Sequence, residues 1–556
     1  MSVFKKELAR FNPEPFGRRW LFIPYDQLSD GIGPLSREYP QDLGIVLVEN
    51  PWKAARRPYH KQKLALILAN MRCFALEQAQ RGVAIRHVVA SGPYRMTLEP
   101  LAQELGEMRV MEPAERELRK DLEPFFESGQ LELIPHEGWL TKRAQFDAIK
   151  KEGPRWRMDA FYRHVRKDSG ILMEKNKPLG GKFSFDVSNR KPWHGKPPAP
   201  IPPTFPSNPI KEEVGQLIQD VFSQHPGRLD LKALPSTRED SQILWSWAKH
   251  NCLDSFGPYE DAMSILSTGI FHTRISSLLN IHRLLPKEAI SDAVSMDLPL
   301  ESKEGFVRQI LGWREFVHHI HDTTDGFRME IGASHQTQEH VGDGGYSHWS
   351  GKPWQFMDNE EDPDGGASPC FLGGETPLPP AYWGRKSGLN CLDHVVASVW
   401  YEGYSHHITR LMILSNIGSL LDVNPRELTD WFWVAYTDAY DWVVEPNVLG
   451  LGTYALGDLI TTKPYISGAA YIHRMSDFCS GCQFDPKKTC PITNLYWAFL
   501  GRHRDKLKEI HRLAMPIKSQ AERKADLRNR DRKIFRFVRE RLVEGEVVFA
   551  SDIRTL

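Results

Sequence analysis

The sequence predicts an α/β domain built on a parallel sheet, followed by an all-helical domain. In the first 140 residues, short apolar runs alternate with helical stretches, which is typical of a Rossmann-like, doubly wound sheet. Beyond residue 210 the apolar periodicity is helical almost throughout. Between the two, eight of the eighteen residues at 192–209 are proline, which indicates an extended connection.

Five buried strands are expected in the first domain, with a long helix at 61–81 among the intervening helices. The strands are predicted at 20–25, 44–48, 84–89, 109–111 and 131–135. No glycine-rich phosphate loop follows the first strand, so a ligand would have to be held in another way. Asp26 lies where that strand ends, at the edge where open α/β sheets bind ligands, although a turn-capping role is an equally good interpretation.

Composition indicates a globular protein. Of 556 residues, 41% are hydrophobic and 26% are charged, which excludes wholesale disorder. The chain has no apolar run of about 18 residues, and its first 17 residues lack the apolar core of a secretory signal. We therefore expect a cytoplasmic protein that does not contact a membrane.

The overall charge is balanced, but its distribution is uneven. Basic and acidic residues number 71 each, whereas the stretches 141–196 and 502–541 each carry 15 basic and 6 acidic residues. We call these two stretches the first and second basic tracts. They fit a track for phosphates, and they also fit ordinary solvated surfaces.

Four of the seven cysteines form a set suited to metal binding. They are spaced C-x87-C-x2-C-x7-C, at Cys391, Cys479, Cys482 and Cys490. Four thiolates suit either Zn²⁺ or a [4Fe-4S] cluster, and the ligand type does not separate the two. The other three cysteines lack such neighbours and are expected to be ordinary core or loop residues: Cys73, Cys252 and Cys370.

Two histidine groups are candidate sites. His406, His407 and Arg410 are expected on the same long helix as Cys391, about 22 Å from it at 1.5 Å per residue. One of these histidines, paired with Arg410, could form a cationic, proton-donating wall. In the second group, His318, His321 and Asp322 share a helical face that could hold a metal, but solvated polar residues are the favoured interpretation.

Four strings in the second half of the chain are specific enough to indicate a family. They are FVRQILGWREF (306–316), YSHHITRLMIL (404–414), TDAYDWVVEPNVLG (437–450) and TKPYISGAAYIHRMSDFCSGC (462–482). Together with the four cysteines they resemble the iron-sulfur bacterial cryptochromes and photolyases, the prokaryotic (6-4) photolyase branch of the cryptochrome/photolyase superfamily. The resemblance runs from about residue 20 to residue 515.

The resemblance implies a domain layout. It consists of an α/β antenna domain at 18–140, a basic, proline-rich connection at 141–209, a helical FAD and [4Fe-4S] domain at 210–515, and a basic helical tail at 516–556. A Gly/Pro/acidic excursion is expected at 326–384 within the helical domain. The cluster ligands would be Cys391, Cys479, Cys482 and Cys490.

The resemblance also assigns site residues. Those implied around FAD are Ser277, Gln309, Trp313, Arg314, Asp438, Trp442 and Asn447. Trp383 and Trp431, with Trp433 as a further candidate, resemble the aromatic relay that carries an electron to photoexcited FAD. The lesion site would comprise His406, His407, Arg410 and Tyr465, with a charged His407 as the proton donor to a base flipped out of UV-damaged DNA.

A ribityl-lumazine antenna chromophore is implied as well, with Asp26, Gln27 and Glu49 as its contacts. Three positions depart from the family pattern. Val444 stands where an acidic residue is expected beside the flavin, Phe432 stands where some members have tyrosine, and Tyr25 stands where a glycine precedes Asp-Gln-Leu. Tyr25 would crowd the antenna chromophore.

Three functions are therefore considered. The leading one is light-driven repair of (6-4) photoproducts by a monomeric enzyme. The first alternative is a photoreceptor of the same family that signals without repair, which the Val444 position favours. The second is a non-catalytic nucleic-acid-binding protein with a four-cysteine metal site and no flavin.

Overall fold

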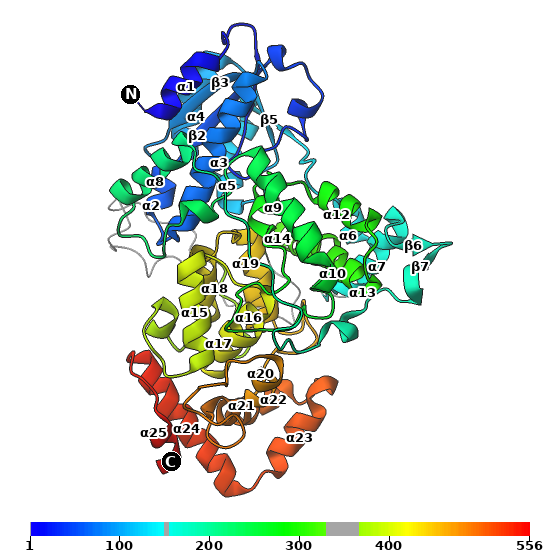
Figure 1. Cartoon of the computed structure of the whole chain (residues 1–556), viewed down its shortest axis with the longest axis vertical. Coiled ribbons are helices and arrows are strands. Elements are labelled where there is room, and N and C mark those ends of the chain that lie inside the picture. The colour runs from blue at the N-terminus through cyan, green and yellow to red at the C-terminus, as the bar shows by residue number, and fades with distance from the viewer. Residues whose placement is uncertain (1, 150–154, 330–365) are drawn as a thin grey trace.

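The computed structural model describes residues 2–149, 155–329 and 366–556. Figure 1 shows the sheet with its helices at one end of the molecule and the C-terminal helices at the other. The remaining helices lie between them. Most of the predicted excursion at 326–384 falls outside the described residues.

The sheet has five parallel strands in the order β3-β2-β1-β4-β5. They are β1 (Arg19–Phe22), β2 (Leu43–Glu49), β3 (Ala84–Val89), β4 (Met108–Met111) and β5 (Leu131–Ile134). All five predicted strands are confirmed, although β1 ends before Tyr25. β2 is buried along its whole length, as expected for a strand that is apolar on both faces.

The first basic tract is partly folded rather than extended. It contains helices α6 and α7 and the short hairpin β6 (Met173–Glu174) and β7 (Lys177–Pro178), whereas residues 190–208 form no helix or strand. The helices up to this point are α1 (Val3–Phe11), α2 (Pro51–Ala55), α3 (Lys61–Gln80), α4 (Tyr94–Leu105), α5 (Arg116–Glu127), α6 (Arg143–Asp147) and α7 (Met158–Ser169).

The rest of the described chain is helical, as predicted. Its first helices are α8 (Pro209–Val221), α9 (Arg238–Asn251), α10 (Leu253–Phe256), α11 (Ser276–Asn280), α12 (Pro286–Ser295), α13 (Leu300–Val307) and α14 (Glu315–Thr323). They are followed by α15 (Asn390–Glu402), α16 (His407–Thr409), α17 (Asn416–Leu420), α18 (Pro425–Ala435), α19 (Asp441–Val444), α20 (Ala469–Met475), α21 (Pro491–Arg502), α22 (Arg504–Leu507), α23 (Ala514–Glu522), α24 (Ala525–Val543) and α25 (Ala550–Thr555).

The prediction of one continuous helix from Cys391 through Arg410 is wrong. α15 ends because Gly403 adopts the left-handed conformation, with φ of 65°, and its N–H donates to the carbonyl of Val399. The chain is then extended at His406 before α16 begins at His407. The separation of about 22 Å, which assumed a straight helix, therefore does not apply.

The C-terminal helices pack as part of the helical domain. The carboxylate of Asp531 on α24 accepts hydrogen bonds from Asn494 on α21 (2.8 Å) and from Arg523 (2.7 Å). Within the described ranges, the structure contains no helix that is both long and apolar enough to cross a bilayer.

Candidate functional site

A cavity of about 260 Å³ lies where the two largest clusters of buried hydrophobic residues meet. Trp313 marks this meeting point, since it lines the cavity and packs against both clusters. Three π-helical turns contribute to its wall, at Arg308–Arg314, Arg410–Ser415 and Glu445–Gly452. Such turns redirect side chains out of the regular helical pattern and are frequent at functional sites. We call this space the central cavity.

Most of the predicted flavin and lesion residues line the central cavity, although they are far apart in the sequence. They are Gln309, Trp313, Arg314, His406, His407, Arg410, Asp438, Trp442 and Asn447. Ser277 is not among them and lines a neighbouring cavity instead, whereas Thr273 and Ser276 do line the central cavity. Tyr465 is also outside the lining, half-buried beside Thr461.

An ion pair fixes one side of the central cavity. The guanidinium of Arg410 binds the carboxylate of Asp438 through two hydrogen bonds of 3.0 and 2.9 Å, and Ser276 donates a third of 2.6 Å. Burial alone would raise the pKa of Asp438, but Arg410 and these hydrogen bonds hold it below its usual value. The carboxylate is therefore charged and oriented without help from a ligand.

A second arginine is held by aromatic rings. The guanidinium of Arg314 lies 4.3 Å from the ring centre of Trp139 and 5.4 Å from that of Trp442. Burial lowers the pKa of Arg314 to about 10, which still leaves it protonated at neutral pH. Trp139 belongs to the segment that follows β5, and no sequence motif marks it as part of this site.

The two adjacent histidines have different surroundings. His406 is buried and stacks on His272, with ring centres 4.5 Å apart, and its Nδ1 has no hydrogen-bond partner among the described residues. His407 projects into the central cavity and is exposed there.

The surroundings of both histidines favour the neutral imidazole. Burial and the neighbouring His272 lower the pKa of His406, and the surrounding protein together with Arg410 lowers that of His407. Because His407 keeps contact with solvent in the cavity, we expect the smaller shift there. The predicted charged histidine would therefore have to gain its proton when a substrate arrives.

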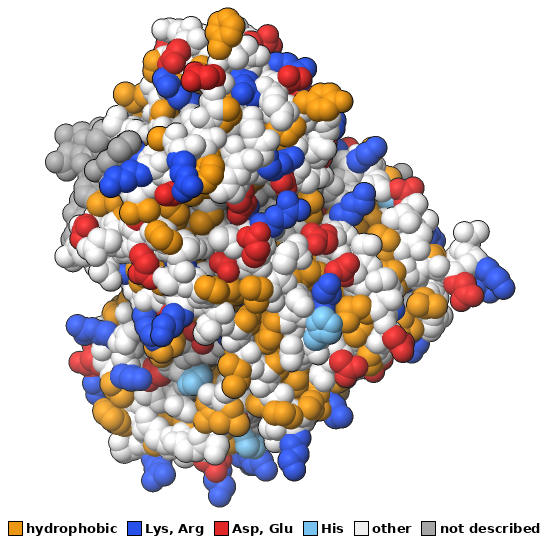
Figure 2. All heavy atoms as spheres, turned by 45° about the horizontal axis from the view of Figure 1, so that its top comes forward, with side chains coloured by type: hydrophobic (Ala, Val, Ile, Leu, Met, Phe, Trp, Pro, Cys, Tyr) orange, Lys and Arg blue, Asp and Glu red, His pale blue; other side chains and the backbone are white. Residues whose placement is uncertain are grey.

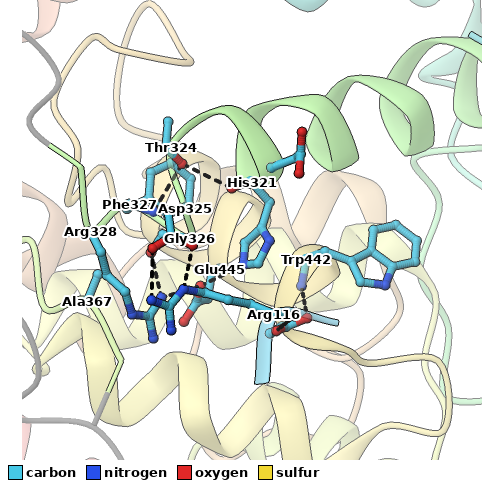
Figure 3. A network of polar contacts seen from close by, with 12 residues as sticks. Arg116, His321, Thr324, Asp325, Gly326, Phe327, Arg328, Ala367, Trp442 and Glu445 are labelled. Carbon is cyan, nitrogen blue, oxygen red and sulfur yellow. Dashed lines mark hydrogen bonds and ion pairs between the residues drawn. The ribbon is translucent and has the colours of Figure 1, made fainter. Parts of the chain in front are cut away.

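Glu445, the acidic residue next to Val444, points away from the central cavity. It accepts a hydrogen bond of 2.8 Å from Arg426 and lies 2.9 Å from the Nε2 of His321. Figure 3 shows His321 and Arg328 facing this carboxylate. Burial would raise the pKa of Glu445, but Arg328 and Arg426 hold it well below its usual value. Val444 does not line the cavity either.

The second histidine group forms no metal site. His318 stacks on Trp139 at 3.6 Å, His321 binds Glu445, and Asp322 pairs with Arg143 at 3.0 Å. Among the residues that the structure describes, no three His, Cys, Asp or Glu side chains are arranged to hold a single metal ion. The solvated interpretation is wrong for His321, which is buried in the network of Figure 3.

The predicted tryptophans are joined by one that was not predicted. Trp383 is 38% exposed, whereas Trp431 is fully buried. Trp400 lies between them, with ring centres 5.4 Å from Trp383 and 6.0 Å from Trp431. Trp431 in turn contacts the ring of Tyr436 at 6.1 Å. Trp433, the further candidate for the relay, does not line the central cavity but another cavity, described below.

The four predicted cysteines come together around one small cavity, formed by the start of α15, the loop after α20 and the start of α21. Burial and the other thiols raise the pKa of Cys391 well above its usual value, that of Cys479 to about 11 and that of Cys490 to about 12. A bound cation would offset the repulsion that four thiolates would have at this site. Phe478 borders this cavity and a smaller one that His406 also lines.

A cavity of about 310 Å³ lies at the carboxyl ends of β1 and β2, lined by Tyr25, Tyr59, Tyr94, Trp433 and Tyr440. We call it the sheet-edge cavity. Of the predicted antenna contacts only Glu49 lines it, and its carboxylate is already bound by Arg72 at 2.6 and 2.9 Å.

The structure does not bring the other two predicted antenna contacts to this cavity. Gln27 donates to the carbonyls of Met111 and Glu112, at 3.1 and 3.2 Å, where β4 ends. Asp26 is buried without a hydrogen-bond partner for either carboxyl oxygen among the described residues. The three predicted antenna contacts are therefore not gathered on the sheet-edge cavity, which Tyr25 lines.

One arginine from each basic tract lies near Lys463 on the helical domain. Burial lowers the pKa of Lys463, and Arg512 of the second tract and Arg190 of the first lie near enough to lower it further. The same two arginines act on the hydroxyl of Tyr465. On the face shown in Figure 2, by contrast, Lys and Arg side chains are interspersed with Asp and Glu.

Comparisons with known proteins identify a family and a relative. Residues 21–233 match the family model described as deoxyribodipyrimidine photo-lyase-related protein. The chain is 30% identical over 522 residues to a (6-4) photolyase of Agrobacterium fabrum, an alignment that covers 91% of this chain and 96% of that one.

Two solved structures match the chain over most of its length. A cryptochrome of Synechocystis sp. PCC6803 superposes with a TM-score of 0.52 and 12% identity, over 91% of this chain and 99% of that one. A bacterial class III photolyase from Agrobacterium tumefaciens gives a TM-score of 0.49 and 12% identity, over 97% and 98%.

Proposed function

The chain belongs to the cryptochrome/photolyase family, and on that premise we propose that it is a (6-4) photolyase that uses light, FAD and a [4Fe-4S] cluster to repair UV-damaged DNA. One observation carries the proposal. The residues suited to a flavin and the two adjacent histidines line the same cavity, which is the arrangement needed if a flipped-out base is to be repaired beside a cofactor.

The central cavity fits FAD by the chemistry of its wall. Arg314 can bind a pyrophosphate, the hydroxyls of Thr273 and Ser276 can donate to phosphates, and Trp313 provides an apolar face. The buried Nε1 of Trp442 has no partner among the described residues and would gain one. When bound and reduced, FAD supplies the electron for repair under light.

His407 is the proposed proton donor to the lesion. It is the exposed member of the histidine pair, whereas His406 is held in place by its stack on His272. Phosphates of bound DNA would raise the pKa of His407 and so charge it at the moment when a proton is needed. Arg410 stays bound to Asp438 and contributes fixed positive charge.

DNA would bind where the two basic tracts meet. Arg190, Lys463 and Arg512 would contact phosphates without regard to sequence. Tyr465 lies among them, so we place it at the DNA surface rather than inside the cavity.

The four cysteines are the proposed ligands of the [4Fe-4S] cluster. Their thiols surround one cavity, yet no three of them are arranged for a single ion. A cluster binds its four thiolates at separate corners, so this wider arrangement suits it better than zinc. We propose that the role of the cluster is structural.

Repair of a defined (6-4) oligonucleotide under blue light tests the proposal. The purified protein should carry flavin and iron and should restore the bases. His407→Ala should keep both cofactors and lose repair, whereas the exposed His473→Ala should keep repair. A protein that carries flavin but repairs nothing would instead be a photoreceptor, and one with zinc and no flavin would be a nucleic-acid-binding protein. The Val444 argument for the photoreceptor is weakened, because Val444 does not line the cavity.

A further inference from the structure

A stack of aromatic rings joins the sheet-edge cavity to the central cavity. The ring of Tyr25 lies 6.2 Å from that of Tyr440, with planes 22° apart, and Tyr440 lies 6.5 Å from Trp442, with planes 15° apart. Tyr25 and Tyr440 line the sheet-edge cavity, whereas Trp442 lines the central cavity. The three rings are buried, so the stack crosses the interior between the two domains.

The polar partners of these rings differ in one respect. Tyr440 and Trp442 are buried, and neither the hydroxyl of Tyr440 nor the Nε1 of Trp442 has a hydrogen-bond partner in the described part of the chain. The hydroxyl of Tyr25, by contrast, donates a hydrogen bond to the carboxylate of Glu115. The ammonium of Lys53 also pairs with the carboxylate of Glu115.

This difference decides where an oxidised ring would be stable. A phenol that loses an electron becomes strongly acidic, so its radical persists only if a base takes the proton. Tyr440 has no such base at its hydroxyl, whereas Tyr25 has Glu115. Lys53, 5.5 Å from the ring centre of Tyr25, would also disfavour a positively charged radical, which makes the proton transfer necessary.

We propose that Tyr25 is a redox-active tyrosine that donates an electron through Tyr440 and Trp442 to the photoexcited flavin of the central cavity. Tyr25 loses one electron to the flavin and its hydroxyl proton to Glu115, so that a neutral phenoxyl radical and a protonated Glu115 result. Recombination returns the electron to Tyr25 from the flavin and the proton from Glu115. This inference rests on the proposed function only in requiring a flavin in the central cavity.

The route is separate from the tryptophans at Trp383 and Trp431. Those rings lead from the surface through Trp400 and reach Tyr436, whereas Tyr25 and Tyr440 approach from the sheet domain. The chain therefore has a second donor, and this donor has its proton acceptor within hydrogen-bond distance.

Electron paramagnetic resonance of the flavin-loaded protein, frozen under blue light, tests the inference. We expect a tyrosyl radical that changes its hyperfine pattern when tyrosine is ring-deuterated. Tyr25→Phe keeps the stacked ring but has no hydroxyl, so the signal should be lost while bound flavin absorbance and the unfolding midpoint stay near those of the wild type. Glu115→Gln should reduce the signal because it removes the base. Tyr94→Phe is the matched control, since Tyr94 lines the same cavity but lies off the stack.

The same tyrosyl signal in Tyr25→Phe as in the wild type would overturn the inference, and so would a wild-type protein with flavin but no tyrosyl radical. The repair proposal fails separately. A protein that forms the Tyr25 radical but does not repair DNA would overturn repair and support this inference, whereas a chain that binds no flavin would overturn both.

Discussion

Trp383 and Trp400 stack with ring centres 5.4 Å apart and planes inclined by 20°. The indole N–H of Trp400 donates to the carbonyl of Tyr382 at 2.8 Å, and that of Trp431 donates to the same oxygen at 2.9 Å. One carbonyl therefore orients both indoles. The exposed Trp383 is joined to the buried Trp431 only through Trp400 in this set of contacts.

We expect Trp400→Phe to slow photoreduction of the flavin several-fold, because phenylalanine keeps the stack but is much harder to oxidise than tryptophan. The measurement is the rate of flavin bleaching under blue light with an external thiol. Trp247→Phe on α9 is the control, since Trp247 belongs to neither ring pair. Equal rates for Trp400→Phe and the wild type would remove Trp400 from the relay.

The cysteine cavity predicts a coupled loss of iron and stability. Cys391 is buried at the start of α15 and is the proposed ligand most distant in sequence from the other three. Cys391→Ala should lower the iron content and reduce the free energy of unfolding by about 2 kcal/mol or more, because binding free energy at such a site is also folding free energy. Cys370→Ala, which alters a half-buried cysteine outside this cavity, should retain iron. Full iron content in Cys391→Ala would exclude Cys391 as a ligand.

Local sequence patterns predicted more of the fold than of the candidate site. The five strands are short apolar runs of about the right length, so their positions could be predicted closely. The break of α15 at Gly403 could not, because glycine is tolerated within helices and only the tertiary contacts of the following turn favour its left-handed conformation.

Site residues could be predicted where a motif carries them and not elsewhere. Arg314 and Asp438 lie in specific strings, whereas Trp139 and Trp400 reach their partners only through the tertiary fold. The resemblance placed Asp26 and Gln27 in an antenna site, yet the side chain of Gln27 bonds the carbonyl of Met111 on β4, and neither residue lines the sheet-edge cavity.

The meeting of the two basic tracts predicts a position-specific effect on DNA binding. Arg512 is exposed and lies near Lys463, whereas Arg536 is an exposed arginine of the same tract on α24. Arg512→Glu should weaken binding to damaged and undamaged duplexes alike and reduce the salt dependence of binding by about one phosphate contact. Arg536→Glu makes the same charge change and should have the smaller effect in a titration at several salt concentrations. Equal effects would indicate that only net charge matters.

The buried carboxyl of Asp26 predicts a pH-dependent loss of stability. Burial and the nearby Glu115 raise its pKa from 3.8 to about 7, and neither oxygen has a hydrogen-bond partner among the described residues. Above pH of about 4 the unfolded chain releases the Asp26 proton, whereas the folded state keeps it up to a pH of about 7. The stability that protonated Asp26 contributes is therefore fully present in acid and is lost as the pH rises through 7.

Asp26→Asn removes this titration, because asparagine stays neutral at every pH. The free energy of unfolding of the variant minus that of the wild type should rise by about 2–3 kcal/mol from pH 5 to pH 8. Denaturant titration of both proteins at the two pH values measures this change. Comparing the two pH values cancels the cost of burying the new amide, since that cost does not depend on pH. Asp297→Asn, at an exposed aspartate, should show no such gain. A wild type and an Asp26→Asn variant with parallel pH profiles would mean that Asp26 is not buried in the folded protein as the structure shows.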